Sequence, residues 1–571
     1  MHGGDQVADV LKKHNIKWVF TLCGGHISPI LTGCNKVDIK IIDTRHESTA
    51  VFAADAVSRL SGTIGVAAVT AGPGLTNSIT PIKNSQLAQS PVLILGGATA
   101  TVLKNRGSLQ DIDHLSLVKS ITKGSFSVRR LKNLSRTIQK AINLAISGVP
   151  GPVYVEVPVD ILFPEEVVRK WYGLKKDSKS MPWWMSLYLN WNVNYLFNNN
   201  KRLINPPQKK ARTISPNQKI NQLKRLIEKA KKPIVLIGSS IMLDPDQASN
   251  IADSIKKLAI PTYVSGSARS LLSRSDIPLF RHNRKSSLKE SDLVVLFGVP
   301  CDFRLDYGRQ INYRAKIVAI NKSRKDMLLN IKPSLCINHN PATIIIEIAK
   351  TKIKNNWTAW IDSINKKEKE RKKNIQSQAD KKTNSINPIK FFTLLDGHLS
   401  NNDIIIADGG DFVATASYIL RPRSFTGWLD PGVFGTLGVG SGFALGAKLC
   451  HPSSTVWIIF GDGSFGYSLI EFDTFIRHNI PVIAIIGNDA GWTQIARDQV
   501  DILEDPIGTE LRYTKYDLAV AGIGGCGLSI EKEKDIDKIL IRAKEAASQG
   551  NPVAINVKIE NTDFRKGSIS I

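Results

Sequence analysis

One strand–helix–strand stretch, residues 455–488, constrains the fold more than any other part of the sequence. An apolar run ends in Gly461 and Asp462, a helical pattern follows, and a second apolar run, 481–486, ends shortly before Asn488. Two strands joined through a helix are expected to be parallel, with a right-handed crossover. Both loops therefore lie at the carboxyl edge of one sheet, where open α/β folds bind ligands.

The same alternation of apolar strands and helical patterns recurs along the 571 residues. It predicts an α/β protein with three doubly wound parallel-sheet domains, and the first and third parts have similar patterns. The predicted parts are an N-terminal domain (1–165), a Trp-rich basic linker or insertion (166–217), a central α/β domain (218–350), a charged linker or solvated helix (351–385) and a C-terminal domain (386–571). The main predicted strands are 17–22, 39–43, 64–70, 91–95, 153–157, 233–237, 292–297, 316–320, 404–407, 455–460 and 481–486.

The loops that end the 455–488 unit carry oxygen ligands. Mg²⁺ prefers six oxygens in near-octahedral geometry. The Asp462 carboxylate, the Asn488 amide oxygen and the Ala490 carbonyl supply three, and two phosphate oxygens and a water would complete the set. Gly463 allows close approach of a phosphate, and the helix amides that begin near Ser464 favour an anion. The alternative is a plain strand-to-helix turn in which Asp462 only caps the helix.

Taken together, these residues resemble the thiamine-diphosphate signature of the acetolactate synthase and decarboxylase superfamily. The resemblance implies thiamine diphosphate and Mg²⁺ as cofactors, and it covers nearly the whole chain apart from the two linkers. It also implies roles for residues elsewhere in the chain. These are Glu47 as the glutamate that activates the cofactor pyrimidine, Pro73 and Asn77 in the loop that lines it, Gln110 on the substrate side, and Leu437 as the wedge that bends the cofactor.

Several of these residues have a simpler explanation. Glu47 could favour a helix N-terminus by charge, and Leu437 could be an ordinary core leucine. Asp408, in a Gly-rich loop after residues 404–407, could face the diphosphate or cap the next helix. His26 and His46 could carry protons or be structural. In the superfamily the activating glutamate and the metal site come from two chains, so we expect a homodimer or homotetramer with active sites at the chain interface.

Shorter motifs narrow the resemblance, namely residues 24–29, 43–47, 301–305, 465–472, 487–494 and 562–565. They are similar to the animal acetolactate synthase-like family of 2-hydroxyacyl-CoA lyases. That family implies cleavage of 2-hydroxyacyl-CoA to formyl-CoA and an aldehyde one carbon shorter, as in fatty acid α-oxidation. The alternatives are an acetolactate synthase-type carboligase acting on 2-oxo acids and a catalytically silent scaffold.

The net charge of +26 raises the question of partners. No aromatic-interleaved basic motif or zinc-finger spacing accompanies it, so we expect no nucleic-acid binding. A basic surface would attract an anionic acyl-CoA. The six cysteines are far apart and form no CxxC pair, which favours a reducing compartment.

Membrane association has two possible sources in the sequence. The family implies an anchor in the endoplasmic reticulum membrane with a cytosolic enzyme, but no apolar run of signal or membrane-spanning length follows Met1. The resemblance therefore predicts a location on the cytosolic side of the endoplasmic reticulum membrane, and the alternative is a cytoplasmic location. The Trp-rich segment 182–197 could be a linker helix packed on a neighbour or an interfacial helix on a membrane surface.

Overall fold

The computed structural model of the chain describes residues 2–174, 181–198 and 216–565, and the chain divides into two compact units, residues 1–211 and 212–571. In the described residues of both units, no helix combines the length and the apolar character that crossing a bilayer requires.

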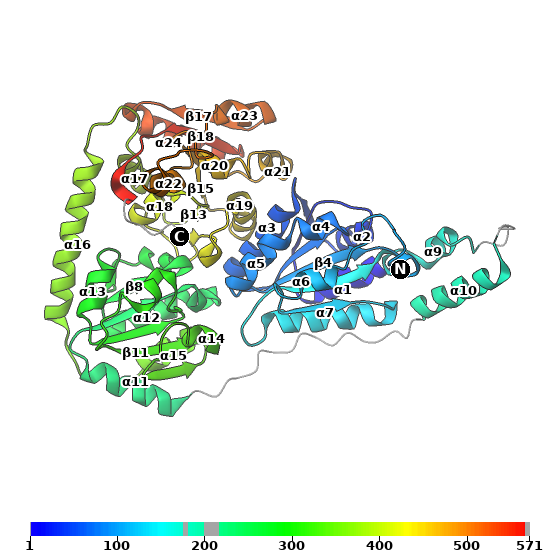
Figure 1. The fold of residues 1–571 in the computed structure, drawn as a ribbon, viewed down its shortest axis with the longest axis horizontal. Helices are drawn as coiled ribbons and strands as arrows, with labels where there is room; N and C mark the ends of the chain where they lie inside the picture. The colour runs from blue at the N-terminus through cyan, green and yellow to red at the C-terminus, as the bar shows by residue number, and fades with distance from the viewer. Residues whose placement is uncertain (1, 175–180, 199–215, 566–571) are drawn as a thin grey trace. The chain divides into compact units, whose positions relative to one another are not determined.

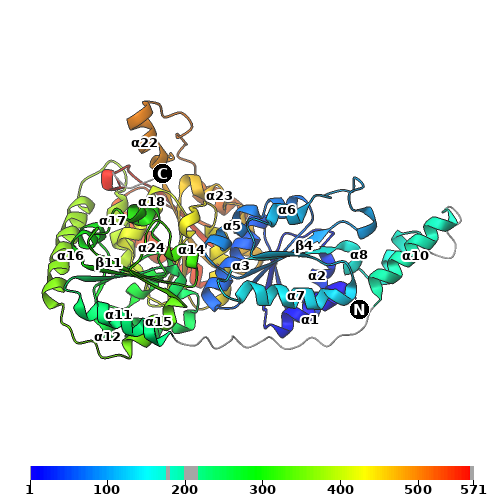
Figure 2. The same ribbon diagram turned by 60° about the horizontal axis from the view of Figure 1, so that its bottom comes forward.

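The first unit contains one six-stranded parallel sheet (Figure 1). Its strands are β1 (Trp18–Thr21), β2 (Lys40–Asp43), β3 (Gly65–Val69), β4 (Val92–Ala98), β5 (Gly124–Ser127) and β6 (Val153–Pro158), in the order β2-β1-β3-β4-β6-β5. Its helices are α1 (Gly3–Lys13), α2 (Ser28–Lys36), α3 (Glu47–Ser61), α4 (Pro73–Thr76), α5 (Ile79–Leu87), α6 (His114–Val118), α7 (Leu131–Ile146), α8 (Val159–Leu162), α9 (Glu165–Trp171) and α10 (Trp183–Phe197). Helices α3 and α5 cover one face of the sheet, and α1, α2 and α7 cover the other (Figure 2).

The second unit contains two further six-stranded parallel sheets. The first has β7 (Pro233–Ile237), β8 (Thr262–Val264), β9 (Leu279–Phe280), β10 (Leu293–Phe297), β11 (Lys316–Asn321) and β12 (Leu335–Asn338), in the order β12-β11-β10-β7-β8-β9. The second has β13 (Ile404–Ala407), β14 (Trp428–Leu429), β15 (Val456–Gly461), β16 (Ile483–Asn488), β17 (Cys526–Ile530) and β18 (Val553–Lys558), in the order β14-β13-β15-β16-β18-β17. The central strands of all three sheets are buried on both faces, as expected for parallel sheets covered by helices.

Helices cover these two sheets as well. Around the β7–β12 sheet lie α11 (Asn217–Lys229), α12 (Ala248–Leu258), α13 (Arg284–Glu290), α14 (Arg324–Met327) and α15 (Pro341–Ala349), and α16 (Thr358–Ala379) follows them along the chain. Around the β13–β18 sheet lie α17 (Pro388–His398), α18 (Asp411–Ile419), α19 (Gly440–Cys450), α20 (Asp462–Phe465), α21 (Glu471–Arg477), α22 (Thr493–Leu503), α23 (Tyr516–Ile523) and α24 (Ile536–Ser548). The predicted fold class, three doubly wound parallel sheets, is confirmed.

The sheet orders show where ligands are expected to bind. The β1–β6 and β13–β18 sheets have the same strand order, which agrees with the similar patterns of the first and third parts of the sequence. In each sheet, the order in which successive strands are added reverses between two adjacent parallel strands. These are β1 and β3 in one sheet and β13 and β15 in the other. Open α/β sheets bind ligands in the crevice at the carboxyl end of such a pair. The loops after β3, β13 and β15 are those that the sequence singled out.

Parts of the secondary structure differ from the prediction. The helix expected after Asp462 is two short helices, α20 and α21. The strands β5, β8, β9, β12, β14, β17 and β18 were not predicted, and all of them except β18 lack a strong apolar run. The charged segment near residue 366 forms the single helix α16, which is largely exposed. The domain boundaries themselves stay predictions.

Candidate active site

Asp462 joins the two loops at the carboxyl ends of β15 and β16. It follows Gly461, which pairs with Gly487 in the sheet register, so Asp462, the first residue of α20, and Asn488, the last residue of β16, lie at the same edge of the sheet. The buried Asp462 carboxylate accepts hydrogen bonds from the Gly463 amide (2.8 Å) and from the Gly491 amide (3.2 Å). The structure therefore brings together the two loops that the sequence predicted to converge.

The orientation of the Asn488 amide is fixed by its neighbours. Its Nδ2 donates to the Thr514 carbonyl (3.0 Å) and to Asn556 Oδ1 (3.1 Å). Its Oδ1 is buried and has no hydrogen-bond partner among the described residues. A buried amide oxygen without a donor is uncommon in proteins, and a cation would satisfy it.

The carboxyl groups at this point also fit a cation. Burial and, to a smaller extent, the neighbouring Asp489 carboxylate together raise the pKa of Asp462 to about 7. Burial likewise raises the pKa of Asp489 to about 6. A divalent ion would reverse this effect by favouring the ionised carboxylates. In the described ranges no three His, Cys, Asp or Glu side chains form a metal cluster, so an ion here would need oxygens from a ligand such as a diphosphate.

The remaining predicted residues of this loop pair lie beside Asp462. Ala490 has a left-handed backbone conformation (φ +58°), and its carbonyl already accepts a hydrogen bond from the Leu511 amide (2.7 Å), which leaves one lone pair for a metal. A Cβ at Gly463 would lie 2.6 Å from the Trp492 ring, so a side chain does not fit there. Ser464 is buried, and its hydroxyl donates to the Gly461 carbonyl (3.1 Å).

Asp408 supports the loop that carries Leu437. Its carboxylate accepts from the amides of Gly438 (3.1 Å) and Gly440 (2.7 Å), so it holds the start of α19. Leu437 is only partly buried, lines a cavity, and lies against Gly409, where an added Cβ would be 2.4 Å from Leu437 Cδ2. Its position is therefore that of a cavity wall rather than of the core.

Asp408 gives a prediction about pH. Burial raises the pKa of its carboxyl to about 7, although the amides of the 438–440 loop partly offset this. A carboxyl whose pKa is higher in the folded than in the unfolded protein makes folding less favourable as the pH rises from about 4 to about 7. We expect Asp408→Asn to flatten the fall of the melting temperature of the cofactor-free protein over this range. Asp473→Asn, at a partly exposed side chain, serves as the control, and equal slopes for Asp408→Asn and wild type would contradict the assignment.

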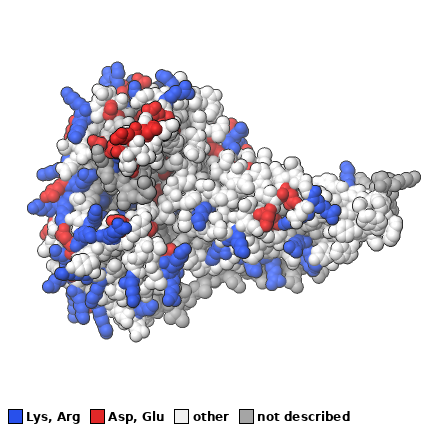
Figure 3. All heavy atoms as spheres, in the orientation of Figure 1, with Lys and Arg blue, Asp and Glu red and all other residues white. Residues whose placement is uncertain are grey.

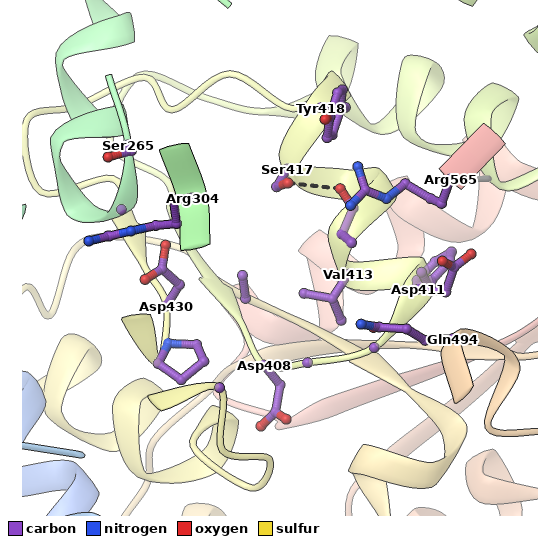
Figure 4. A pocket seen from close by; sticks show the side chains of 18 of the residues that line it. Ser265, Arg304, Asp408, Asp411, Val413, Ser417, Tyr418, Asp430, Gln494 and Arg565 are labelled. Atoms are coloured by element: carbon purple, nitrogen blue, oxygen red, sulfur yellow. Dashed lines mark hydrogen bonds between the residues drawn. The ribbon is translucent and has the colours of Figure 1, made fainter. Parts of the chain in front are cut away.

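A cavity of about 1150 Å³ extends from these loops to the β7–β12 sheet. Figure 4 shows residues around it from loops and helices beside both sheets: Ser265 and Arg304 beside the β7–β12 sheet, and Asp408, Asp411 and Gln494 beside the β13–β18 sheet. Its walls also include six arginines, namely Arg269, Arg281, Arg284, Arg304, Arg371 and Arg565. No sequence motif marks this cluster, because its members are scattered over nearly 300 residues.

The first unit holds the other predicted residues. Glu47 is the first residue of α3 and is buried, 5% exposed. The Asn77 side chain donates to Glu47 Oε2 (3.0 Å). The loop after β3 thus orients the carboxylate at the start of α3, and the structure brings these two predicted residues into contact.

A buried histidine that the sequence did not single out holds the same loop. His114 Nε2 accepts from the Gly72 amide (2.9 Å), and its Nδ1 lies 2.9 Å from Glu156 Oε2. This arrangement fixes the imidazole with the proton on Nδ1, facing the carboxylate. Gly72 has φ +60° and lies directly against Gln110, since an added Cβ would be 2.9 Å from Gln110 Cβ. Pro73 follows as the first residue of α4.

The two other histidine candidates differ. His46 caps α3, with Nδ1 accepting from the Ser48 amide (3.2 Å), which is a structural role. His26 lies 3.3 Å from the Thr70 hydroxyl, and burial lowers its pKa. His26 therefore stays a candidate for proton transfer, at the β1–β3 edge of the sheet.

Comparison with known proteins decides the family. Three domain models of the thiamine pyrophosphate enzyme family match the chain. They are the N-terminal TPP binding domain at residues 1–117, the central domain at 220–348 and the C-terminal TPP binding domain at 408–557. The chain belongs to the thiamine pyrophosphate enzyme family. It is therefore an enzyme, and thiamine diphosphate is its cofactor.

Individual relatives of this thiamine pyrophosphate enzyme differ in closeness. It is 46% identical to the 2-hydroxyacyl-CoA lyase 2 of Danio rerio over 588 residues, covering 100% of the chain and 93% of the relative. A probable acetolactate synthase of Mycobacterium bovis is 28% identical over 558 residues, covering 98% and 95%. The structure of a thiamine diphosphate-dependent 4-hydroxybenzoylformate decarboxylase from Rhodococcus jostii RHA1 has the same fold, with a TM-score of 0.79, 18% identity, and coverage of 99% and 100%.

Proposed function

We propose that this enzyme cleaves 2-hydroxyacyl-CoA into formyl-CoA and an aldehyde one carbon shorter. In this reaction the C1–C2 bond breaks, the hydroxyl-bearing C2 becomes the aldehyde carbonyl as its hydroxyl proton leaves, and C1 gains a proton. Thiamine diphosphate, when bound, supplies the electron sink for the electron pair left on C1. The 46% identity to a 2-hydroxyacyl-CoA lyase, against 28% to an acetolactate synthase, supports the lyase over the carboligase.

The arginine-lined cavity is the main structural support for a coenzyme A ester as the substrate. Arg269 donates to the Ser417 carbonyl (2.6 Å), Arg281 to the carbonyls of residues 418–420, and Arg284 to the Arg304 carbonyl (2.6 Å). Among the described residues, none of these three guanidinium groups forms an ion pair with a carboxylate. Their positive charges therefore share one cavity without a directly bound counterion.

The charges in this cavity act on one another. Burial lowers the pKa of Arg269 and of Arg284, and burial together with Arg269 lowers the pKa of Arg281 to about 10. Burial and the nearby positive charges, among them Arg281 and Arg371, lower the pKa of His282 to about 3. An anion would relieve this repulsion. A coenzyme A ester carries a diphosphate and a further phosphate on its nucleotide, whereas a small 2-oxo acid brings one carboxylate.

In the same proposal, the chain's own residues divide the work. Asp462, Asn488 and Ala490 hold Mg²⁺, while Gly463 and Ser464 approach the diphosphate. Glu47 exchanges a proton with the cofactor pyrimidine, and Asn77 holds its carboxylate in place. Pro73, Gln110 and Leu437 shape the walls of the site. His114 keeps the Gly72 loop in position without touching a ligand.

Assembly and location are part of the proposal. Glu47 lies in the first unit and Asp462 in the second, and the superfamily builds each site from two chains, so we propose a homodimer or homotetramer. Light scattering of the purified protein tests this directly. The endoplasmic reticulum membrane, expected from the resemblance, is tested by cell fractionation.

The central experiment supplies the chain with 2-hydroxyacyl-CoA, thiamine diphosphate and Mg²⁺ and measures aldehyde and formyl-CoA. A parallel reaction replaces the ester with pyruvate and measures acetolactate. We expect aldehyde only from the ester and only when the cofactor and Mg²⁺ are both present. Acetolactate formation without any coenzyme A ester would favour the carboligase instead.

One variant tests the arginine cluster. Loss of a charge-assisted contact costs about 1.5–3 kcal/mol, so we expect Arg284→Gln to raise the KM for the coenzyme A ester about tenfold or more. The affinity for thiamine diphosphate should change little. Arg314→Ala, at an exposed position outside the cavity, is the matched control. An unchanged KM in Arg284→Gln would mean that the nucleotide part of coenzyme A does not bind at Arg284.

A further inference from the structure

Helix α10 has one buried side. It contains 15 residues and no charged one. Val193 and Leu196 are buried, and Leu196 joins the core between the β1–β6 sheet and helices α1, α2 and α7. Arg169 of α9 donates to the side-chain oxygens of Asn190 (3.1 Å) and Asn194 (2.6 Å). The helix is therefore anchored in a defined orientation on the first unit.

The opposite side of α10 exposes large apolar side chains. Trp183 is 78% exposed, Leu187 65% and Trp191 61%. The exposed large side chains of this helix also include Trp184, Tyr188 and Tyr195, and the helical spacing of all six places them on one face. We call these six residues the aromatic face. Contiguous exposed apolar surface of this kind marks an interaction site.

The surroundings of the aromatic face are basic. The Arg130 guanidinium lies 3.4 Å from the centre of the Tyr195 ring, and α7, against which α10 packs, carries Lys132, Arg136 and Lys140. The sequence from 114 to 155 contains no Asp or Glu. On the neighbouring α9, Glu165 is paired with Arg169 (2.6 Å), and the same helix also carries the exposed Glu166 and Lys170. Figure 3 shows Lys and Arg side chains over α7 and none over the visible part of α10.

We propose that the aromatic face of α10 docks on the headgroup region of an anionic phospholipid bilayer. Trp and Tyr favour this region because one end of each ring is apolar and the other polar, and basic residues nearby are attracted to anionic headgroups. A helix of 15 residues is about 22 Å long, shorter than the hydrocarbon core, so it lies along the surface and does not cross it.

A second copy of the chain fits this face less well. A two-fold contact through α10 would bring Arg130 and the basic α7 of one copy close to the same groups of the other. Those charges would repel each other, whereas a negatively charged surface neutralises them. This inference concerns a different surface from the proposed active site and stands independently of the reaction.

The test uses the whole chain with thiamine diphosphate and Mg²⁺, and vesicles of phosphatidylcholine alone or of phosphatidylcholine mixed with anionic phosphatidylserine. We expect co-sedimentation with the anionic vesicles and at least a tenfold weaker association with neutral ones. The triple variant Trp183→Ser, Leu187→Ser, Trp191→Ser should lose association at least tenfold. A matched triple variant, Tyr313→Ser, Leu328→Ser, Ile541→Ser, removes exposed apolar side chains elsewhere and should bind like wild type.

Several outcomes would overturn the proposal. The wild type could fail to associate with anionic vesicles, or could associate equally with neutral ones. The α10 variant could associate normally. A change in the oligomeric mass of the α10 variant would instead identify the aromatic face as a protein interface. Should the α10 variant fail to fold, quenching of wild-type tryptophan fluorescence by brominated lipid gives an independent answer. Quenching supports docking, and its absence contradicts it.

Discussion

Replacement of Glu47 by Gln is expected to abolish product formation while cofactor binding stays largely intact. The amide keeps the shape of the side chain, and its oxygen can still accept the hydrogen bond from Asn77. It cannot take up or release the proton that a carboxylate exchanges. Because a positioned acid–base group contributes about 10²–10⁴-fold to a rate, turnover should fall by at least that factor. Steady-state aldehyde formation and calorimetric titration with thiamine diphosphate measure the two effects.

The control for this variant is another glutamate on a helix. Glu347→Gln, on α15, changes a partly exposed side chain whose partner is Lys350 (2.7 Å), and we expect full activity from it. Normal turnover in Glu47→Gln would remove Glu47 from the mechanism. Loss of cofactor affinity together with activity would instead give Glu47 a binding role.

The sequence predicted the parts of the fold that have strong local signals. The strand 404–407 was predicted with the bounds that β13 has, because three isoleucines and an alanine between polar residues have little alternative to a buried strand. Short strands such as β14, which has two residues, carry no such signal, since their pairing depends on the neighbouring strand. The break between α20 and α21 was also missed, because the apolar residues on both sides suit one continuous helix.

The candidate site divides in a similar way. Asp462 and Asn488 could be predicted because Asp462 directly follows a buried strand and Asn488 lies at the end of the next one, so topology alone brings them to one edge. His114 and the arginine cluster could not, because their roles depend on contacts over long sequence distances. His114 lies 42 residues from both Gly72 and Glu156, and Arg269 donates to a carbonyl 148 residues away. A polar residue inside an apolar strand, such as Asn556, was a usable signal for the partner of Asn488.

The second large effect is expected at the cation site. Asp462→Ala removes the charged ligand of the proposed Mg²⁺ and the bridge from Gly463 to Gly491. Asn488→Ala removes the buried oxygen that has no partner among the described residues. We expect each change to weaken Mg²⁺-dependent binding of thiamine diphosphate by at least about 100-fold, which corresponds to about 2.7 kcal/mol. Titration of the cofactor at fixed Mg²⁺, followed by calorimetry, measures this loss.

Chelation separates a metal role from a structural one at the same residues. If Asp462 and Asn488 act through the ion, removing Mg²⁺ from the wild type should weaken cofactor binding as much as the substitutions do, and added Mg²⁺ should restore only the wild type. Asp473→Asn, which changes an ion pair with Arg477 (2.8 Å) on α21, should bind the cofactor normally. Cofactor affinity that is the same with and without Mg²⁺ would contradict the cation site. The unsatisfied Asn488 oxygen and the raised pKa of Asp462 would then need another explanation.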